Sequence, residues 1–223
     1  MINSDISIPK TRQDYNLIAH DFSTRRAILT ADFKRLGALV QEKDNILDFG
    51  CGDGRLLRAI GAKSFQYLGV DISDAMINLA RKQFPERTFS IYNNSVLTKT
   101  QNTFDKIFAI AVFHHIPEDA RAQALKLLFY SLKPGGQIIA TVWQANPDII
   151  QKKWTPIADG NKDYSVPYIT KEGVTVNRYI HLFDDQELTK LLLAAGFTGI
   201  KTFHSRRGNT VTNFNLEVIA VKP

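Results

Sequence analysis

The 223-residue chain is predicted to be an α/β protein with a doubly wound, mostly parallel seven-stranded sheet that ends in an antiparallel hairpin. Three observations predict this fold. Short apolar runs alternate with helix-compatible segments along most of the chain, which is typical of a parallel sheet covered by helices. The first of these runs leads directly into a glycine-rich turn. The last two runs follow one another with no helix between them, which indicates an antiparallel pair.

The elements are expected in the following order. Residues 1–14 are polar and should form a loose start, and apolar residues at helical spacing predict an N-terminal helical segment at 15–40, as one or two helices. Ser73, Pro117 and Gly196 are suited to begin or end the helices that they flank. Helices are then expected at 53–61, 74–83, 117–131 and 183–195, and strands at 45–49, 65–70, 88–92, 104–112, 137–143, 198–204 and 214–221.

Length and composition limit the function classes. The chain suits one domain over residues 1–223, and its 44% apolar and 22% charged residues are ordinary for a soluble protein. We expect a cytoplasmic protein with no membrane partner, because no apolar run could span a bilayer and the N-terminus lacks a signal pattern. Cys51 is the single cysteine, so neither disulfides nor a cysteine-rich zinc site is expected, and no metal is predicted. The net charge of +6 permits RNA as a partner but is weak evidence by itself.

A glycine loop follows the first predicted strand, with Gly50, Gly52 and Gly54 at every second position. Glycine allows sharp turns and a close approach of the backbone to a ligand. A P-loop would need lysine followed by serine or threonine after the last glycine, and Arg55 and Leu56 stand there instead. The glycine spacing also differs from that of a dinucleotide fingerprint. The loop therefore indicates a nucleotide site of another kind.

Two acids accompany this loop. Asp48, at the end of the first strand, would repel a pyrophosphate but favours a cationic amine. Asp71, at the end of the second strand, can accept both hydroxyls of a ribose. Together with the loop they describe a site for S-adenosylmethionine. The alternative, a tight turn at 50–54 with Asp71 as a helix cap, is disfavoured by the presence of both acids and by the strand order.

This pattern resembles the class I methyltransferases, a Rossmann-like family that uses S-adenosylmethionine. The resemblance implies that Cys51 and Ala111 belong to the cofactor site and that Ile72 and Met76 flank the adenine. Most relatives have an aspartate that accepts a hydrogen bond from the adenine amino group. This chain instead has Asn93, Asn94 and Ser95 at that place, and either asparagine could accept the bond.

A narrower resemblance covers most of the chain. Residues 15–26, 110–116 and 178–183 look like those of the tRNA wobble-uridine methyltransferases, which convert a carboxymethyl group on uridine to its methyl ester. The resemblance implies tRNA as a partner, and a small activator subunit accompanies the eukaryotic members. It also implies that Tyr15 and one arginine, either Arg25 or Arg26, lie at the cofactor.

The chemistry of methyl transfer limits the acceptor independently of this resemblance. Methylation at C5 of a pyrimidine usually needs a cysteine nucleophile, and the only cysteine lies in the cofactor loop. The fourth strand lacks the Asn/Asp-Pro-Pro-aromatic end common in amine methylation of nucleic acids. A carboxylate acceptor is already ionised and needs no base. We therefore expect Arg178 to grip the acceptor carboxylate, with His114, His115 and His181 orienting the acceptor, and the 144–180 segment to be an insertion near this site.

Other readings stay open. The two adjacent histidines could simply form a strand-end loop, and Arg178 could brace the 144–180 segment. The same cofactor half would serve a small-molecule O- or N-methyltransferase, in which case the partner is a small metabolite. A cofactor-binding subunit without catalysis is a third function, disfavoured because the loop and both acids are intact.

Overall fold

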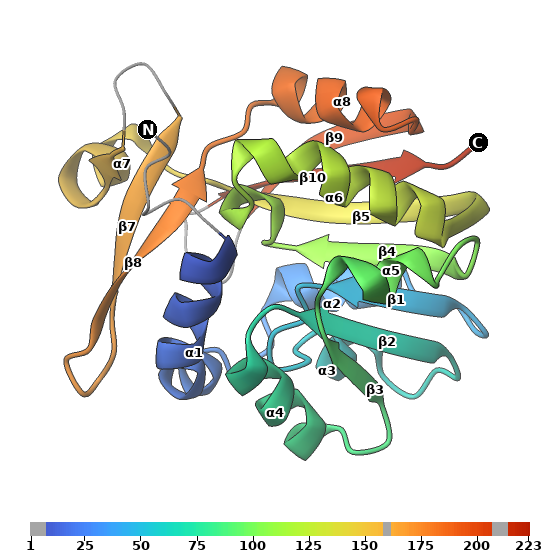
Figure 1. The fold of residues 1–223 in the computed structure, drawn as a ribbon, viewed down its shortest axis with the longest axis horizontal. Coiled ribbons are helices and arrows are strands. Elements are labelled where there is room, and N and C mark those ends of the chain that lie inside the picture. The colour runs from blue at the N-terminus through green and yellow to red at the C-terminus, as the bar shows by residue number, and fades with distance from the viewer. Residues whose placement is uncertain (1–7, 158–161, 207–213) are drawn as a thin grey trace.

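The computed structural model describes residues 8–157, 162–206 and 214–223. Its main sheet has the strand order β3 (Thr88–Ile91), β2 (Gln66–Asp71), β1 (Asn45–Phe49), β4 (Phe104–Ile110), β5 (Leu132–Gln144), β10 (Phe214–Val221), β9 (Thr198–Arg206). The first five of these strands run parallel, and β10 is inserted antiparallel between β5 and β9. The predicted fold class is thereby confirmed, including the C-terminal hairpin (Figure 1).

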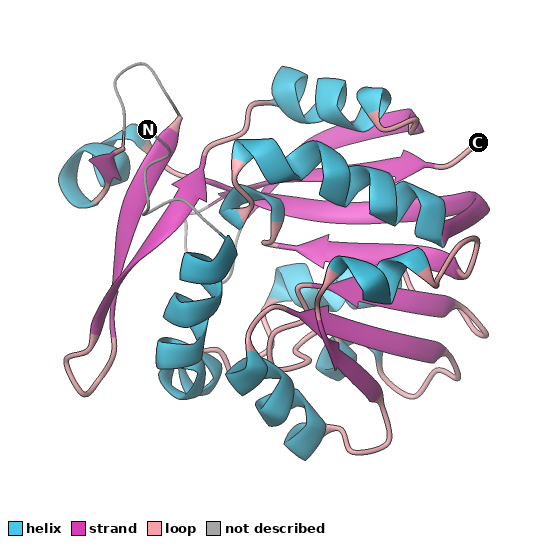
Figure 2. Ribbon diagram, viewed as in Figure 1, coloured by secondary structure: helices cyan, strands magenta, loops and turns pink. Residues whose placement is uncertain are grey.

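Helices cover both faces of this sheet (Figure 2). They are α1 (Ile8–Arg25), α2 (Ala31–Ala38), α3 (Leu57–Ile60), α4 (Asp74–Gln83), α5 (Asn94–Thr98), α6 (Glu118–Ser131), α7 (Pro147–Lys153), α8 (Asp185–Ala194) and the 3-10 turn η1 (Phe113–His115). A second sheet is formed by β6 (Thr155–Pro156), β7 (Asp163–Ile169) and β8 (Thr175–His181). None of the described helices has the length and apolar character needed to cross a membrane.

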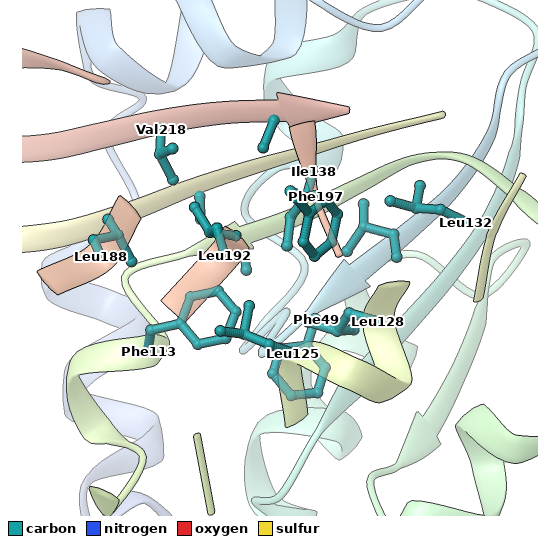
Figure 3. Packing of buried hydrophobic residues seen from close by; sticks show 14 of the residues in the cluster. Phe49, Phe113, Leu125, Leu128, Leu132, Ile138, Leu188, Leu192, Phe197 and Val218 are labelled. Atoms are coloured by element: carbon teal, nitrogen blue, oxygen red, sulfur yellow. The ribbon is translucent and has the colours of Figure 1, made fainter. Parts of the chain in front are cut away.

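Two hydrophobic cores lie on opposite faces of the main sheet, because successive side chains of a strand point to opposite sides. Ile107 and Ala109 of β4 pack with α5, α6 and α8, whereas Phe108 between them packs with α2, α3 and α4. Figure 3 shows the first core, in which Leu125 and Leu128 of α6 approach side chains of α8 and of the strands. The strongly apolar central strands thus hold the polar strand ends in place.

The expected helix boundaries are mostly confirmed by capping contacts. The Ser73 hydroxyl accepts a hydrogen bond from the Met76 amide at 3.1 Å, and the Asp184 carboxylate accepts one from the Glu187 amide at 2.8 Å. Gly196 follows α8 with φ +103°. These contacts satisfy backbone groups that a helix end would leave unpaired.

Two helix starts differ from the expectation, and one short helix was not expected. The helix after the glycine loop covers only Leu57–Ile60, because positive φ angles continue to Gly54 and helical geometry cannot start earlier. A short helix, α5, occupies part of the polar run after β3. Helix α1 begins at Ile8 rather than after residue 14, because polar contacts to α4 order its first turns; residues 1–7 lie outside the described part. Arg12 donates to both carboxylate oxygens of Asp74, at 2.8 and 3.0 Å.

The 144–180 segment, for which the sequence showed no period, forms α7 and the second sheet. Side chains of its strands point alternately to two faces, and both faces are largely buried, one among apolar side chains and one among polar side chains. Val166 and Ile180 pack with Trp143 of β5, whereas Asp163 and His181 on the opposite face are buried in hydrogen bonds. Arg178 on the apolar face and Tyr179 on the polar face interrupt the apolar–polar alternation of β8, so the sequence shows no clean strand period there.

The loop glycines give a first testable prediction. A Cβ at Gly50 (φ +74°) would lie 2.3 Å from the Val112 side chain, whereas one at Gly135 (φ +77°) would meet nothing within 4 Å. Gly50→Ala should therefore lower the free energy of unfolding by about 2–4 kcal/mol, through backbone strain plus overlap. Gly135→Ala should cost about 1 kcal/mol from strain alone. Urea unfolding of both variants tests this, and equal losses would contradict the role of the Val112 contact.

Candidate active site

A pocket of about 220 Å³ lies where β1, β2, β4 and β5 end, beneath helix α1. In a doubly wound sheet the carboxyl ends of the strands form the usual ligand crevice. Most residues expected at the cofactor line this pocket. They are Tyr15, Arg26, Asp48, Gly50, Cys51, Gly52, Asp71, Ile72, Met76, Asn94 and Ala111.

The glycine loop forms the floor of the pocket. The amides of Gly50 and Cys51 both donate to the Val70 carbonyl, at 2.7 and 3.0 Å, which folds the loop back onto β2. A Cβ at Gly52 would meet nothing within 4 Å, so this glycine (φ +55°) faces open space in the pocket. Gly54 does not line the pocket. A Cβ at this position would lie only 3.0 Å from the Phe84 ring, so there is little room for a side chain there. The loop thus leaves room for a ligand at its centre.

Asp48 is buried at the edge of the pocket with little to balance its charge. The Tyr67 hydroxyl donates to its carboxylate at 2.7 Å. Burial nevertheless raises the pKa of Asp48 to about 7, and the neighbouring acids Asp71 and Asp53 add to the rise. An incoming cation would relieve this cost, so the site fits a ligand that carries an amine or a sulfonium.

Asp71 is held by backbone donors. Its two carboxylate oxygens accept from the amides of Gly52 at 2.9 Å and Ser73 at 2.8 Å. Burial raises the pKa of Asp71 to about 6, although these amides oppose the rise. A carboxylate oxygen has two acceptor positions, so Asp71 can still accept from a ligand diol. These two bonds fix the position of the Asp71 carboxylate relative to Gly52.

Helix α1 covers the pocket and supplies part of its wall. The Ser23 hydroxyl donates to the Asp53 carboxylate at 2.7 Å, which fastens α1 to the glycine loop. Of the two candidate arginines, Arg26 lines the pocket, and its guanidinium lies 3.7 Å from the Phe22 ring centroid. Arg25 instead forms an ion pair with Asp21 at 2.9 Å and is not a lining residue.

The structure also distinguishes the two candidate asparagines. Asn94 lines the pocket. The Asn93 carbonyl oxygen accepts from the Val96 amide and caps α5, and the Ser95 hydroxyl donates to that same oxygen. Asn93 and Ser95 are therefore not among the lining residues. Tyr92 lines the pocket and was not expected there, since in sequence it resembles the last core residue of the strand predicted at 88–92.

The other end of the pocket is aromatic. His115 lines it together with Trp143, which was not expected to be a site residue from the sequence. The His115 Nδ1 donates to the Tyr179 carbonyl at 2.9 Å, so its Nε2 accepts from the Tyr15 hydroxyl at 2.8 Å. Burial, and secondarily the Arg178 charge, lower the pKa of His115 to about 3. This imidazole is therefore neutral over the physiological range.

His114 lies behind the wall that His115 forms. It is fully buried, and its Nδ1 accepts from the Trp143 amide at 3.3 Å. It is not a lining residue of the pocket. Ala111 at the same strand end adopts φ +59°, a conformation that costs free energy and often occurs at functional sites.

Arg178 is buried behind Trp143, at the aromatic end of the pocket, with 6% of its surface exposed. Its guanidinium carbon lies 5.3 Å from the Trp143 ring centroid and 5.1 Å from that of Tyr168. Among the described residues, neither Nε nor Nη1 of Arg178 has a hydrogen-bond partner. A buried guanidinium with unused donors is costly unless an anion reaches it.

His181 is placed on the opposite face of the small sheet, away from the pocket. Its Nδ1 is bonded to Asp163 at 2.6 Å and its Nε2 to Glu187 at 2.7 Å. Arg121 of α6 joins this network through the Tyr179 hydroxyl, at 2.7 Å. The network fastens the small sheet to α6 and α8.

A seven-stranded sheet of this order, with an acidic glycine-loop pocket at its switch point, defines the class of S-adenosylmethionine-dependent methyltransferases. The chain belongs to the Methyltransferase domain family, whose model matches residues 22–202. S-adenosylmethionine is its cofactor.

Three curated relatives represent two kinds of methyltransferase. The tRNA (carboxymethyluridine(34)-5-O)-methyltransferase of Arabidopsis thaliana is 31% identical over 150 residues, which cover 65% of this chain but only 35% of that protein. The enzyme of the same name from Schizosaccharomyces pombe is 26% identical, covering 67% of this chain and 72% of its own. A ubiquinone biosynthesis O-methyltransferase of Coxiella burnetii is 28% identical, covering 46% of this chain and 44% of that enzyme.

Solved structures share the fold at low identity. A methyltransferase of Methanosarcina mazei has a TM-score of 0.70 at 23% identity, covering 84% of this chain and 96% of its own. A Haloferax volcanii methyltransferase in complex with the activator Trm112 has a TM-score of 0.69 at 17% identity, covering 96% and 97%. A Burkholderia thailandensis N-methyltransferase with bound S-adenosylhomocysteine has a TM-score of 0.66 at 20% identity, covering 95% and 87%.

The raised pKa values of the two pocket acids predict a pH dependence of cofactor binding. A cationic amine prefers ionised Asp48, whose pKa is about 7 without ligand, so affinity should fall as pH drops below 7. Asp71, with a pKa of about 6, adds a second loss below pH 6. Calorimetry with S-adenosylhomocysteine should show affinity about tenfold weaker at pH 6 than at pH 8.

A ligand without the amine is the control. 5′-Methylthioadenosine retains the ribose but lacks the amino-acid part, so its affinity should stay constant down to about pH 6 and decline only below it, as Asp71 becomes protonated. Parallel curves for the two ligands would show that Asp48 does not face the amine.

Proposed function

We propose that this methyltransferase esterifies the carboxylate of a carboxymethyl-modified wobble uridine in tRNA, in the cytoplasm. In this proposal the chain is one methyltransferase domain, and the segment from α7 to β8 forms the acceptor side. The similarity to the two tRNA methyltransferases supports the substrate, and the following observations on the site support the reaction.

The buried Arg178 guanidinium carries the proposal. Its Nε and Nη1 lack hydrogen-bond partners among the described residues, and it lies beside the aromatic wall of the pocket. A guanidinium is well suited to donate charge-assisted hydrogen bonds to a carboxylate. An acceptor carboxylate that passes Trp143 would accept from one of these donors with one oxygen and present the other oxygen to the methyl group. Holding the two reacting groups in line is the main catalytic need for such a nucleophile.

The state of His115 favours a carboxylate over a hydroxyl acceptor. A hydroxyl must lose its proton during methylation, which calls for a base with a pKa near the working pH. His115 lines the acceptor end, but its pKa of about 3 makes it a poor base. A carboxylate acceptor is ionised already and needs only a position. Within this proposal His115 orients the acceptor through its contact with Tyr15, while His114 supports Trp143.

The cofactor contacts follow from the pocket lining. Asp48 would bind the amine, Asp71 the ribose diol, and the loop around Gly52 would approach the amino-acid part. Adenine would lie by Ile72 and Met76, with Asn94 accepting its amino group. When bound, the cofactor supplies an electrophilic methyl on a sulfonium, and the pocket under α1 excludes water from it.

Nucleoside analysis tests the substrate. Deleting the gene should remove the methyl ester of carboxymethyluridine from tRNA hydrolysates and leave the free acid in its place, as measured by mass spectrometry. Expression of the chain should restore the ester, whereas an Asp71→Ala variant should not. An unchanged nucleoside profile after deletion would contradict the tRNA assignment while leaving the methyltransferase class intact.

A small-molecule O-methyltransferase is the second candidate. The similarity to the ubiquinone biosynthesis enzyme favours it, and that similarity spans less than half of either chain. The two functions differ in the need for Arg178, because a phenol offers no negative charge in its neutral form. Turnover of a phenolic acceptor that is insensitive to Arg178→Ala would support this second function.

A small activator subunit is a proposed further partner. The support is the Haloferax volcanii neighbour, which was solved in complex with the activator Trm112. If such a partner is needed, the purified chain should bind cofactor yet methylate tRNA only when an activator of this type is added. Full turnover by the chain alone would remove this partner from the proposal.

A further inference from the structure

We propose that Tyr168 is a positioning residue, which holds the Arg178 guanidinium for the acceptor and ties its position to closure of helix α1 over the cofactor. This inference rests on the proposed role of Arg178 in gripping the acceptor carboxylate. Neither Tyr168 nor its partner Asp21 lines the cofactor pocket, so their effect on the reaction would pass through other residues.

Tyr168 makes two different kinds of contact with two different elements. Its ring centroid lies 5.1 Å from the guanidinium carbon of Arg178, on the neighbouring strand β8. Its hydroxyl donates to the Asp21 carboxylate of α1 at 2.6 Å. The same ring packs against Phe22, with centroids 5.7 Å apart, and Phe22 lines the cofactor pocket. Tyr168 therefore stands between the cofactor side and the proposed acceptor side.

The ring contacts leave the donors of Arg178 available. An aromatic ring attracts a guanidinium through its face and does not consume the N–H groups at the guanidinium edge. Trp143 and Tyr168 supply two such rings from two different sheets, so the buried cation is held while Nε and Nη1 keep no partner among the described residues. A carboxylate partner in their place would have neutralised the cation and blocked an anionic acceptor.

The hydroxyl contact connects this arrangement to α1. Asp21 accepts from Tyr168 and also from the Lys171 amide, at 3.0 Å, in the turn between β7 and β8. One carboxylate therefore fastens the hairpin to the helix that covers the cofactor. When α1 opens, Tyr168 loses its hydrogen bond and the ring is less fixed against Arg178. Occupancy of the cofactor site should thus favour binding of the carboxylated acceptor.

Calorimetry with a nucleoside probe tests the proposal. The wild-type chain is titrated with 5-carboxymethyluridine, first alone and then saturated with S-adenosylhomocysteine, with uridine as the uncharged comparison. Tyr168→Leu removes the ring and should weaken binding of 5-carboxymethyluridine about tenfold, with binding of uridine and of S-adenosylhomocysteine changed less than about twofold. Tyr168→Phe keeps the ring and removes the hydroxyl, so it should abolish the enhancement that S-adenosylhomocysteine gives.

Two controls separate positioning from a merely structural role. Tyr130→Leu removes an exposed aromatic residue of α6, which does not line the pocket, and should leave binding of the probe unchanged. In an Arg178→Ala background, Tyr168→Leu should have no further effect, because its action passes through Arg178. Additive losses in the double variant would overturn the proposal, and so would wild-type enhancement in Tyr168→Phe.

The two proposals fail in different ways. If Arg178→Ala abolishes the preference for 5-carboxymethyluridine over uridine but Tyr168→Leu does not weaken it, the positioning role is wrong and the proposed function stands. If the wild-type chain shows no preference for the carboxylated nucleoside, the proposed function fails, and the positioning role falls with it.

Discussion

Replacing Arg178 with alanine is expected to lower kcat/KM for carboxymethyluridine-containing tRNA by about 10²–10³-fold. The physical reason is the loss of a buried cation whose Nε and Nη1, unpartnered within the described part of the chain, are expected to bind the acceptor carboxylate. Affinity for S-adenosylmethionine should change less than about twofold, because Arg178 is not a lining residue of the cofactor pocket. Transfer of a radiolabelled methyl group to tRNA measures the first effect, and calorimetry the second.

A lysine at the same position is an informative comparison. Arg178→Lys retains the charge but loses the planar pair of donors, so it should recover only part of the activity. Arg87→Ala serves as a matched control, since the Arg87 guanidinium also lies over an aromatic ring, that of Phe65, and is outside the pocket lining. Wild-type turnover by Arg178→Ala would remove this residue from the mechanism.

Asp71→Ala is expected to raise the Kd for S-adenosylmethionine by about 50-fold or more. The substitution removes the acceptor of the ribose hydroxyls and also frees the amides of Gly52 and Ser73, so that both the ligand contact and the shape of the loop are lost. Hydrogen bonds to a charged group contribute about 1.5–3 kcal/mol each, which gives this magnitude. Calorimetry at pH 8 measures it, where Asp71 of the wild type is ionised.

Asp74→Ala is the control for this variant. Asp74 follows three residues later and is also acidic, but it pairs with Arg12 and does not line the pocket. Its loss should change the cofactor affinity only a few-fold, since exposed ion pairs contribute little. Similar losses in both variants would show that the effect reports general disturbance of α4.

The elements around the cofactor pocket could be predicted because short stretches of sequence determine them. A glycine loop between a strand and a helix, with Asp48 and Asp71 at two strand ends, is determined by short stretches of sequence. Parallel strands bring their carboxyl ends to one edge, so the acids meet without any further information. The doubly wound, mostly parallel sheet and its antiparallel hairpin follow from the order of elements along the chain, and the structure confirms both.

The acceptor half could not be predicted in this way, because it depends on long-range pairing. The approach of Arg178 to Trp143 requires the small sheet to fold against β5, and strand β8 of that sheet lacks a regular apolar–polar alternation in sequence. His181 resembled a site residue in sequence but is occupied by two carboxylates. Whether Arg25 or Arg26 faces the pocket depends on the rotation of α1, which packing alone determines.

Helix α1 has a consequence for the pace of the reaction. It is joined to the glycine loop through Ser23, to α4 through Arg12 and to the β7–β8 turn through Asp21. We expect spent cofactor beneath it to exchange when these contacts separate. Each catalytic cycle would then include one opening of the helix, and the strength of the three polar contacts would set how fast the methyl donor is replaced.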